Sequence, residues 1–234
     1  MTLRSLVLRR LRAPLSWAWL LTAACAGSLA TDPGGPLSPT RLRYQLERGR
    51  TFNSSGEKEQ ARALFVQAWE QAQAAHEEGL AVDAAHMLAI TYSGTPDGPV
   101  WNQRGLELAR ASQDPKARGL IPAMLNNMAW DLHDLGRYPE ALPVFEAAQA
   151  EWTARGKPVQ IRMAKWAVAR CLRSLGRFEQ AMAIQRLLEA ETQSAGAPNR
   201  FVFEEIAENL LALGKPEEAG PYFKRAADMQ EKNE

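Results

Sequence analysis

A short pattern that recurs roughly every 40 residues constrains the fold more than any other feature of this chain. In each copy a glycine is followed four residues later by Glu or Gln, and then by Ala. A fixed period of this length is typical of stacked helical hairpins rather than of one closed core. The copies are Gly56-Gln60-Ala61, Gly136-Glu140-Ala141, Gly176-Gln180-Ala181 and Gly214-Glu218-Ala219.

The residues around each glycine predict how the two helices of a hairpin pack. Seven positions before the glycine the residue is small, and nine positions after it the residue is large in three of four copies. Large residues on one helix therefore oppose small residues on its partner. The glycine itself permits the left-handed conformation that ends a helix. The small set is Gly49, Ala129, Ala169 and Ala207, and the large set is Phe65, Phe145 and Phe223, with Gln185 as the exception.

A fifth, degenerate copy is predicted between the first two clear ones. Residues 81–92 and 100–112 both carry helical apolar spacing, with Leu88, Ala89, Leu106 and Ala109 in core positions. Residues 93–99 (SGTPDGP) between them are rich in turn formers, but they offer no clean equivalent of the recurring glycine. The chain is therefore expected to be all-α, with about five hairpins.

The repeat resembles the tetratricopeptide repeat (TPR) family over roughly residues 40–234. The clearest matches are LGRYPEAL at 135–142 and LGRFEQAM at 175–182. The resemblance implies a right-handed superhelical solenoid of antiparallel helix pairs, in which the first helix of each pair lines a concave groove. Two departures stand out. The spacing of 38–40 residues exceeds the 34 of the family, so some helices or connectors must be longer, and Gln185 predicts a less well packed fourth hairpin.

The first 30 residues predict a signal or anchor segment. Residues 4–12 are basic and residues 13–31 are uncharged, an order typical of export signals. Residues 21–25 (LTAAC) resemble a bacterial lipobox and make Cys25 a lipidation candidate, whereas residues 28–30 offer a signal-peptidase site instead. There are three alternative interpretations: the segment is an uncleaved membrane anchor, it is a mitochondrial presequence, or Cys25 is an incidental residue of the apolar region. Residues 31–39 form a Pro/Gly-rich linker, and residues 40–234 the repeat domain.

The sequence offers no pattern for catalysis, metal binding or a cofactor. His76, His86 and His133 do not have a metal-ligand spacing. The net charge of +1 falls to −3 without residues 1–30, because four of the 28 basic residues lie there and all 27 acidic residues lie elsewhere. A nucleic-acid partner is therefore not expected. Protein partners are expected, together with a possible membrane association through the N-terminal segment.

The resemblance to the TPR family also implies where a partner would bind. Trp130, Trp166 and Phe201 fall on neighbouring repeats on the expected concave side, and exposed aromatic residues beside Arg are typical anchors of interfaces. The alternative is that one or both tryptophans fill gaps between repeats. The expected groove residues are Arg50, Asn126, Trp130, His133, Met163, Trp166, Arg170, Arg173 and Phe201, with Arg43, Leu46, Glu204, Glu208 and Leu211 as further members.

These observations favour a non-catalytic protein-binding scaffold that docks a partner peptide or helix in the groove. By analogy with helical-repeat lipoproteins that assist envelope assembly, it is expected to be exported and periplasmic or membrane-anchored. A soluble or mitochondrial TPR adaptor or assembly factor is the main alternative. An enzyme or metal protein built on the solenoid is a third, which no residue pattern predicts.

Overall fold

The structure, a computed structural model, describes residues 38–231. All regular secondary structure in this range is helical. The predicted signal segment, with the lipidation candidate Cys25, and residues 31–37 of the predicted linker lie outside the described residues. Ser38 is the first described residue, and its hydroxyl caps the first helix by accepting a hydrogen bond from the backbone N–H of Arg41.

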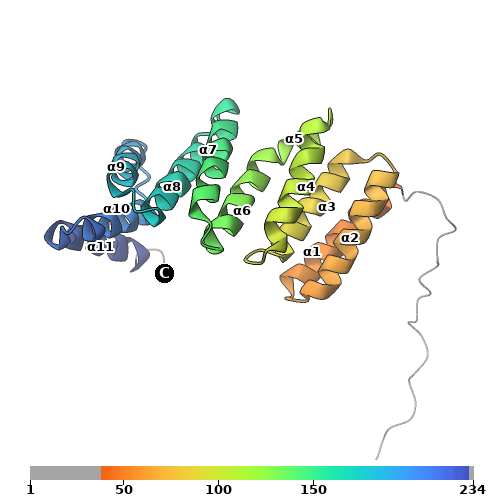
Figure 1. The fold of residues 1–234 in the computed structure, drawn as a ribbon, viewed down its shortest axis with the longest axis horizontal. Helices are drawn as coiled ribbons and strands as arrows, with labels where there is room; N and C mark the ends of the chain where they lie inside the picture. Colours follow the sequence, from red (N-terminus) through yellow and green to blue (C-terminus); the bar gives the residue numbers. More distant parts are fainter. Residues whose placement is uncertain (1–37, 232–234) are drawn as a thin grey trace, which may run out of the picture. The chain divides into compact units, whose positions relative to one another are not determined.

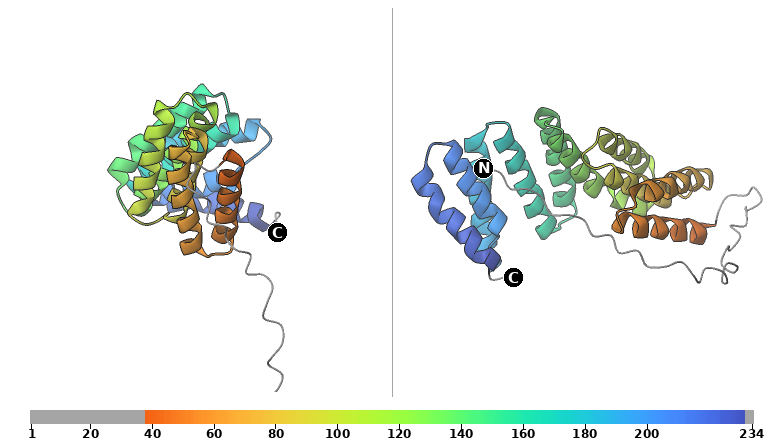
Figure 2. Two further views of the ribbon diagram at one scale, coloured as in Figure 1. Left: turned by 90° about the vertical axis from the view of Figure 1, so that its right-hand side faces the viewer. Right: turned by 90° about the horizontal axis from the view of Figure 1, so that it is seen from below.

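The helices pack as five successive antiparallel hairpins, each against the next (Figures 1 and 2). This arrangement confirms the predicted all-α solenoid. One short helix, α5, lies between the second and third hairpins. The hairpins are α1 (Pro39–Ser54) with α2 (Lys58–Ala74), α3 (Glu78–Thr91) with α4 (Asp97–Ala111), α6 (Ile121–Asp134) with α7 (Tyr138–Ala154), α8 (Pro158–Ser174) with α9 (Phe178–Ser194), and α10 (Arg200–Ala212) with α11 (Pro216–Glu231), while α5 spans Pro115–Gly119.

Left-handed glycines close the hairpins as the pattern predicts. Gly136 has φ +73°, and its neighbour Arg137 donates its backbone N–H back to the carbonyl of Leu132. This bond satisfies a carbonyl that the end of α6 would otherwise leave unpaired. The other recurring glycines share this conformation, and Gly94 supplies it in the degenerate copy, where the sequence shows no clean equivalent.

The interlocking of small and large residues builds the core between paired helices. Gly49 on α1 lies against the fully buried ring of Phe65 on α2, so closely that a Cβ on Gly49 would lie 2.4 Å from the ring carbon Cε1. Ala129 and Phe145 occupy the same positions in the third hairpin and share one core cluster. In the fourth hairpin Gln185 is equally buried, and neither atom of its side-chain amide has a hydrogen-bond partner.

The length of the helices accounts for the long repeat period. Helices α2, α7, α8 and α9 each contain 17 residues. The repeat pattern does not predict α5, which adds one helical turn before the third hairpin. Asp114 caps it by accepting the backbone N–H of Lys116 at 2.9 Å, and α5 packs against α3.

Candidate functional site

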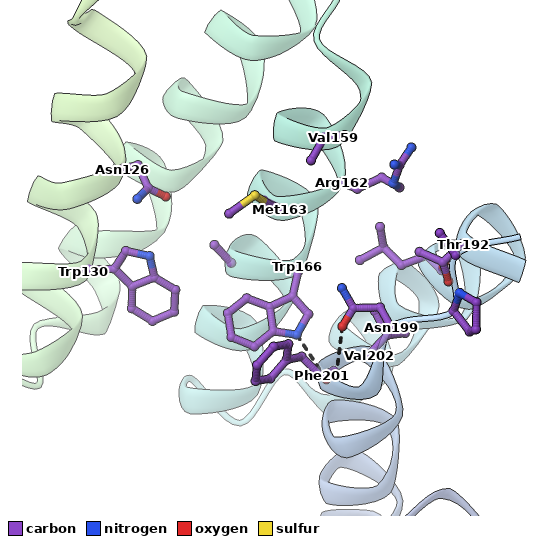
Figure 3. A pocket seen from close by; sticks show the side chains of 14 residues that line it. Asn126, Trp130, Val159, Arg162, Met163, Trp166, Thr192, Asn199, Phe201 and Val202 are labelled. Atoms are coloured by element: carbon purple, nitrogen blue, oxygen red, sulfur yellow. Dashed lines mark hydrogen bonds between the residues drawn. The ribbon is translucent and has the colours of Figure 1, made fainter. Parts of the chain in front are cut away.

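A groove of about 690 Å³ lies beside α6, α8 and the N-terminal end of α10, and the last turns of α9 also line it (Figure 3). It combines residues from three successive hairpins, so the stacking of repeats creates it. Such a volume is within the range of protein binding pockets. The lining residues are Asn126, Trp130, Val159, Arg162, Met163, Trp166, Ala167, Leu188, Thr192, Ala197, Pro198, Asn199, Phe201 and Val202.

Three aromatic rings follow one another along the groove. The centroids of Trp130 and Trp166 lie 5.9 Å apart, and those of Trp166 and Phe201 lie 6.2 Å apart with an angle of 66° between the ring planes. The indole N–H of Trp166 donates to the backbone carbonyl of Phe201 at 3.2 Å, which ties α8 to the start of α10. The predicted row of aromatic residues in neighbouring repeats therefore exists as one continuous surface.

The two tryptophans also contribute to the packing of the repeats. Both are half-buried and lie against the core cluster of the third and fourth hairpins. Trp130 is 4.9 Å from the ring of Phe145, centroid to centroid. They fill space between helices with one part of the ring and line the groove with another, so the two interpretations of these residues are not exclusive.

The exposed large hydrophobic residues of the groove lie on α8 and at the start of α10. Met163 is 65% exposed, Val159 is 55% exposed and Phe201 is 45% exposed. Val159 and Met163 are four residues apart on α8 and so share one face of that helix. Water contacts this surface in the free protein, although burial of its carbon atoms would be favourable.

Two polar side chains on the wall of the groove are already bonded within the protein. The Asn199 side chain accepts the backbone N–H of Phe201 at 2.9 Å, and the Thr192 hydroxyl donates to the carbonyl of Leu188 at 2.8 Å. Arg162 and Asn126 are different, because within residues 38–231 no hydrogen bond or ion pair engages either half-buried side chain. Arg162 is also the single ionisable residue among the described groove-lining residues.

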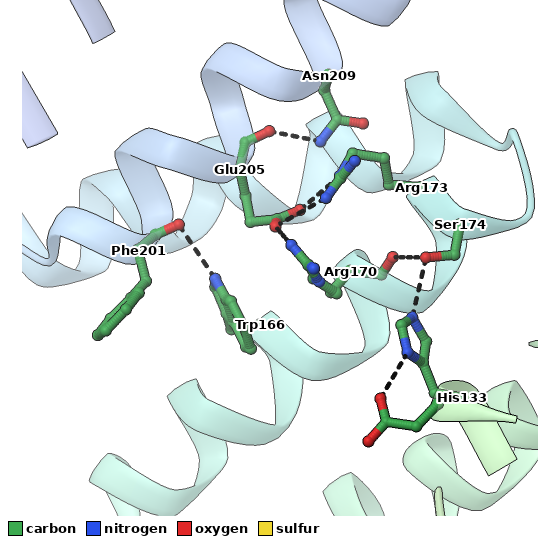
Figure 4. A network of polar contacts seen from close by, with 9 residues as sticks. His133, Trp166, Arg170, Arg173, Ser174, Phe201, Glu205 and Asn209 are labelled. Atoms are coloured by element: carbon green, nitrogen blue, oxygen red, sulfur yellow. Dashed lines mark hydrogen bonds and ion pairs between the residues drawn. The ribbon is translucent and has the colours of Figure 1, made fainter. Parts of the chain in front are cut away.

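Two further arginines of α8 are committed to a buried carboxylate. Glu205 on α10 is 2% exposed and binds Arg170 and Arg173, the latter from Nε at 2.8 Å (Figure 4). Burial alone would lower the pKa of Arg173, but its hydrogen bond to Glu205 and the charge of that carboxylate outweigh it and raise the pKa. This network joins the fourth and fifth hairpins beside the groove without lining it.

His133 extends the same network toward α6. Its Nε2 lies 2.9 Å from the hydroxyl of Ser174, which donates to the carbonyl of Arg170 (Figure 4). The side chain is buried rather than on the groove surface. Burial lowers the pKa of His133, and the charges of Arg170 and Arg173 act in the same direction, against the opposing effect of Asp134.

The predicted groove residues of the first repeat lie elsewhere. Arg50 on α1 is held by Asp83 of α3, with Nη2 2.7 Å from Oδ1. A separate hollow of about 450 Å³ near it is lined by Arg43, Asp83 and Lys116 among others. Leu46 was expected to face the groove, and this is wrong because the buried face of α1 carries it into the core against α2 and α3.

The structure thus brings together five of the nine main groove candidates: Asn126, Trp130, Met163, Trp166 and Phe201. Sequence reasoning missed Val159 and Arg162, although Val159 stands one helical turn before Met163 and could have been found by that spacing. It also missed residues 197–199, a connector that follows no repeat pattern. The further candidates Glu204, Glu208 and Leu211 do not line the groove.

The described residues contain no group of three or more His, Cys, Asp or Glu side chains that could hold a metal ion. None of the helices within residues 38–231 has the length and apolar character needed to span a membrane. Cys171, the one cysteine in this range, is buried in the core of the third and fourth hairpins, and burial raises its pKa to about 11.

Comparison with solved structures shows the same fold in other repeat proteins. A Podosopora anserina putative kinesin light chain with nearly identical TPR-like repeats superimposes with a TM-score of 0.63 at 19% identity, over 84% of this chain and 98% of the other. A MamA mutant gives 0.54 at 22% identity, over 81% and 97%. The apo form of RapI gives 0.71 at 14% identity, over 84% of this chain and 55% of the other.

The chain therefore has the fold of TPR-type repeat proteins. No family model matches the sequence, and no curated protein matches it. At these identities the likeness concerns the fold alone.

Proposed function

We propose that this chain is a non-catalytic scaffold that docks an apolar segment of a partner protein in the groove beside α6, α8 and α10. The observation that carries the proposal is the cluster of Met163, Val159 and Phe201, which stay exposed beside two tryptophans. Covering apolar surface contributes about 25 cal/mol per Å². Contiguous exposed apolar surface with aromatic residues is typical of protein interaction sites.

The chemistry of the groove supports binding rather than catalysis. Its side-chain functional groups are mainly amides, indoles and one guanidinium, and the Thr192 hydroxyl is already bonded to backbone carbonyls. General acid–base or nucleophilic catalysis needs a titratable or activated group within reach of a substrate. The TPR-type fold agrees with a scaffold role, since solenoids of this kind offer extended concave binding surfaces.

The direct test is capture of partners by the full chain and by two matched variants. Met163→Glu places a charge in the groove, whereas Leu187→Glu places one at an equally exposed apolar residue on α9, since Met163 is 65% exposed and Leu187 is 63% exposed. Both changes are on the surface and are expected to leave the helical content unchanged, which circular dichroism checks. Crosslinking and mass spectrometry then identify what each variant retains.

We expect Met163→Glu to lose a partner that the parent chain and Leu187→Glu both retain. If both variants capture the same proteins as the parent, the groove is not the docking site. These variants are preferable to Trp130→Ala or Trp166→Ala, because both tryptophans contact the core and their removal would mix loss of folding with loss of binding.

The proposal includes export and membrane association through the N-terminal segment. It rests on the basic residues 4–12, the uncharged residues 13–31 and the lipobox-like residues before Cys25. Mass spectrometry of the mature N-terminus tests it in the native cell. A lipidated Cys25 supports an envelope role, and an N-terminus produced by organelle import would instead support the mitochondrial adaptor.

A further inference from the structure

We infer that the groove recognises an amphipathic helix that carries a carboxylate beside its apolar stripe, with Arg162 as the group that pairs with that carboxylate. This inference rests on the proposed function and adds the chemistry of the partner. Three features of the groove support it: the positive charge of its lining, the hydrogen bonds that its polar side chains already make, and the spacing of its apolar residues along α8.

The charge of the groove comes from Arg162. No Asp or Glu is present among the groove residues that the structure describes. Two neighbouring cations pair with carboxylates outside the lining: Lys165 with Glu191 at 2.5 Å and Arg200 with Glu204 at 2.9 Å. Arg162 therefore gives an otherwise apolar surface one positive charge. A complementary partner brings a carboxylate, since a cation at a partly desolvated interface favours an opposite charge.

The polar groups of the groove favour a helix over an extended peptide. An extended segment exposes backbone N–H and C=O groups that need partners when they are buried. Here the Trp166 indole, the Asn199 side-chain oxygen and the Thr192 hydroxyl are already bonded within the protein. Asn126 and Arg162 are the polar lining side chains that have no bond within the described residues, too few to pair with the backbone along an extended segment. In addition, the described residues contain no strand to which a peptide strand could add. A helix satisfies its own backbone and presents only side chains to the groove.

The spacing of the exposed apolar residues in the groove suits an amphipathic helix. Val159, Met163 and Trp166 form a stripe along α8, at spacings of four and three residues, and Phe201 lies against the end of this stripe (Figure 3). An amphipathic partner helix has the same spacing of apolar residues. Arg162 precedes Met163 on α8 and so lies next to the stripe, where an acid beside the partner's apolar face would meet it.

Three synthetic peptides and the full chain test the inference. Each peptide is a labelled amphipathic helix of about 15 residues, with Leu at i, i+4 and i+7. The residues beside the Leu stripe are Glu in the first, Gln in the second and Lys in the third. Fluorescence anisotropy measures their affinities for the parent chain and for Arg162→Gln and Arg162→Glu. Lys157→Gln is the control, because it removes a charge from the start of the same helix outside the groove lining.

We expect the parent chain and Lys157→Gln to bind the Glu peptide about two to five times more tightly than the Gln peptide. Arg162→Gln should remove this preference, and Arg162→Glu should shift it to the Lys peptide. Equal binding of the Glu and Gln peptides by the parent chain would overturn the role of Arg162. A fourth peptide is the Glu peptide with a central Pro, which breaks the helix. If it binds the parent chain as tightly as the Glu peptide does, the helical partner is overturned.

The proposed function can fail separately. If Met163→Glu binds the Glu, Gln and Lys peptides as the parent does, the groove is not the docking site, whatever the charge preference. If the parent chain sediments as a dimer that Met163→Glu dissociates, a second copy of this chain occupies the groove, and the inferred helical partner is wrong.

Discussion

Gln185→Met should stabilise the protein, because this glutamine places an unpaired amide in the core of the fourth hairpin. The side chain is 0% exposed, and neither its nitrogen nor its oxygen has a hydrogen-bond partner. In the first and third hairpins the equivalent position holds Phe65 and Phe145, both buried. Methionine keeps the unbranched shape and nearly the length of glutamine, while it removes both polar atoms.

The expected gain follows from two opposing terms. An unsatisfied buried polar group costs about 1–3 kcal/mol. A change of shape at nearly constant volume costs less than about 1.5 kcal/mol. The free energy of unfolding should therefore rise by about 1–2 kcal/mol. For a domain of this size, that corresponds to an increase in Tm of about 2–8 °C.

Urea denaturation followed by circular dichroism measures the effect, with Gln193→Met as the control. Gln193 lies on the same helix, α9, but is exposed, so its replacement should change the free energy of unfolding by less than about 0.5 kcal/mol. If Gln185→Met leaves stability unchanged or lowers it while the control behaves as expected, the amide of Gln185 is satisfied in the folded protein and the reasoning fails.

Three other predictions concern the turns, the core and pH. Gly49→Ala should destabilise by about 1–3 kcal/mol, because the new Cβ would meet the ring of Phe65, whereas Gly119→Ala, in open space at the end of α5, should stabilise by up to about 1 kcal/mol in the same denaturation assay. His76 is the one non-glycine with positive φ in residues 38–231, at +55°, so His76→Gly should raise the free energy of unfolding by about 0.5–1 kcal/mol, and a fall would show that the imidazole makes a compensating contact. The lowered pKa of His133 means that the unfolded chain takes up the proton first, so stability should decline as pH falls below about 6.5, and less steeply in His133→Gln; equal slopes would refute the assignment.

The repeat architecture could be predicted from the sequence because its determinants are local. A turn glycine needs only its own backbone conformation, and the small and large positions around it follow from helix geometry. Gly136 and the pair of Ala129 with Phe145 illustrate this. The short helix α5 escaped prediction because five residues give too little periodicity to recognise.

The candidate site was only partly predictable. Trp130, Trp166 and Phe201 could be placed on one face because each occupies a similar position in its own repeat. The shared partner of Arg170 and Arg173 could not be predicted in this way. Glu205 lies on the next hairpin, and its pairing depends on how one hairpin is rotated against another. The packing of α1 against α2 and α3 places Leu46 in the core.

Residue spacing along the chain is thus enough to predict the number of hairpins, the positions of most of their turns and the row of aromatic residues, since each depends on spacing within about one repeat. Only the tertiary structure decided which of those residues form a continuous groove and which charges are neutralised beside it. The physical reason is that packing between hairpins joins side chains roughly 35 residues apart in the chain, as in Arg170 with Glu205 and Trp166 with Phe201, and a single-repeat pattern carries no information on the angle at which they meet.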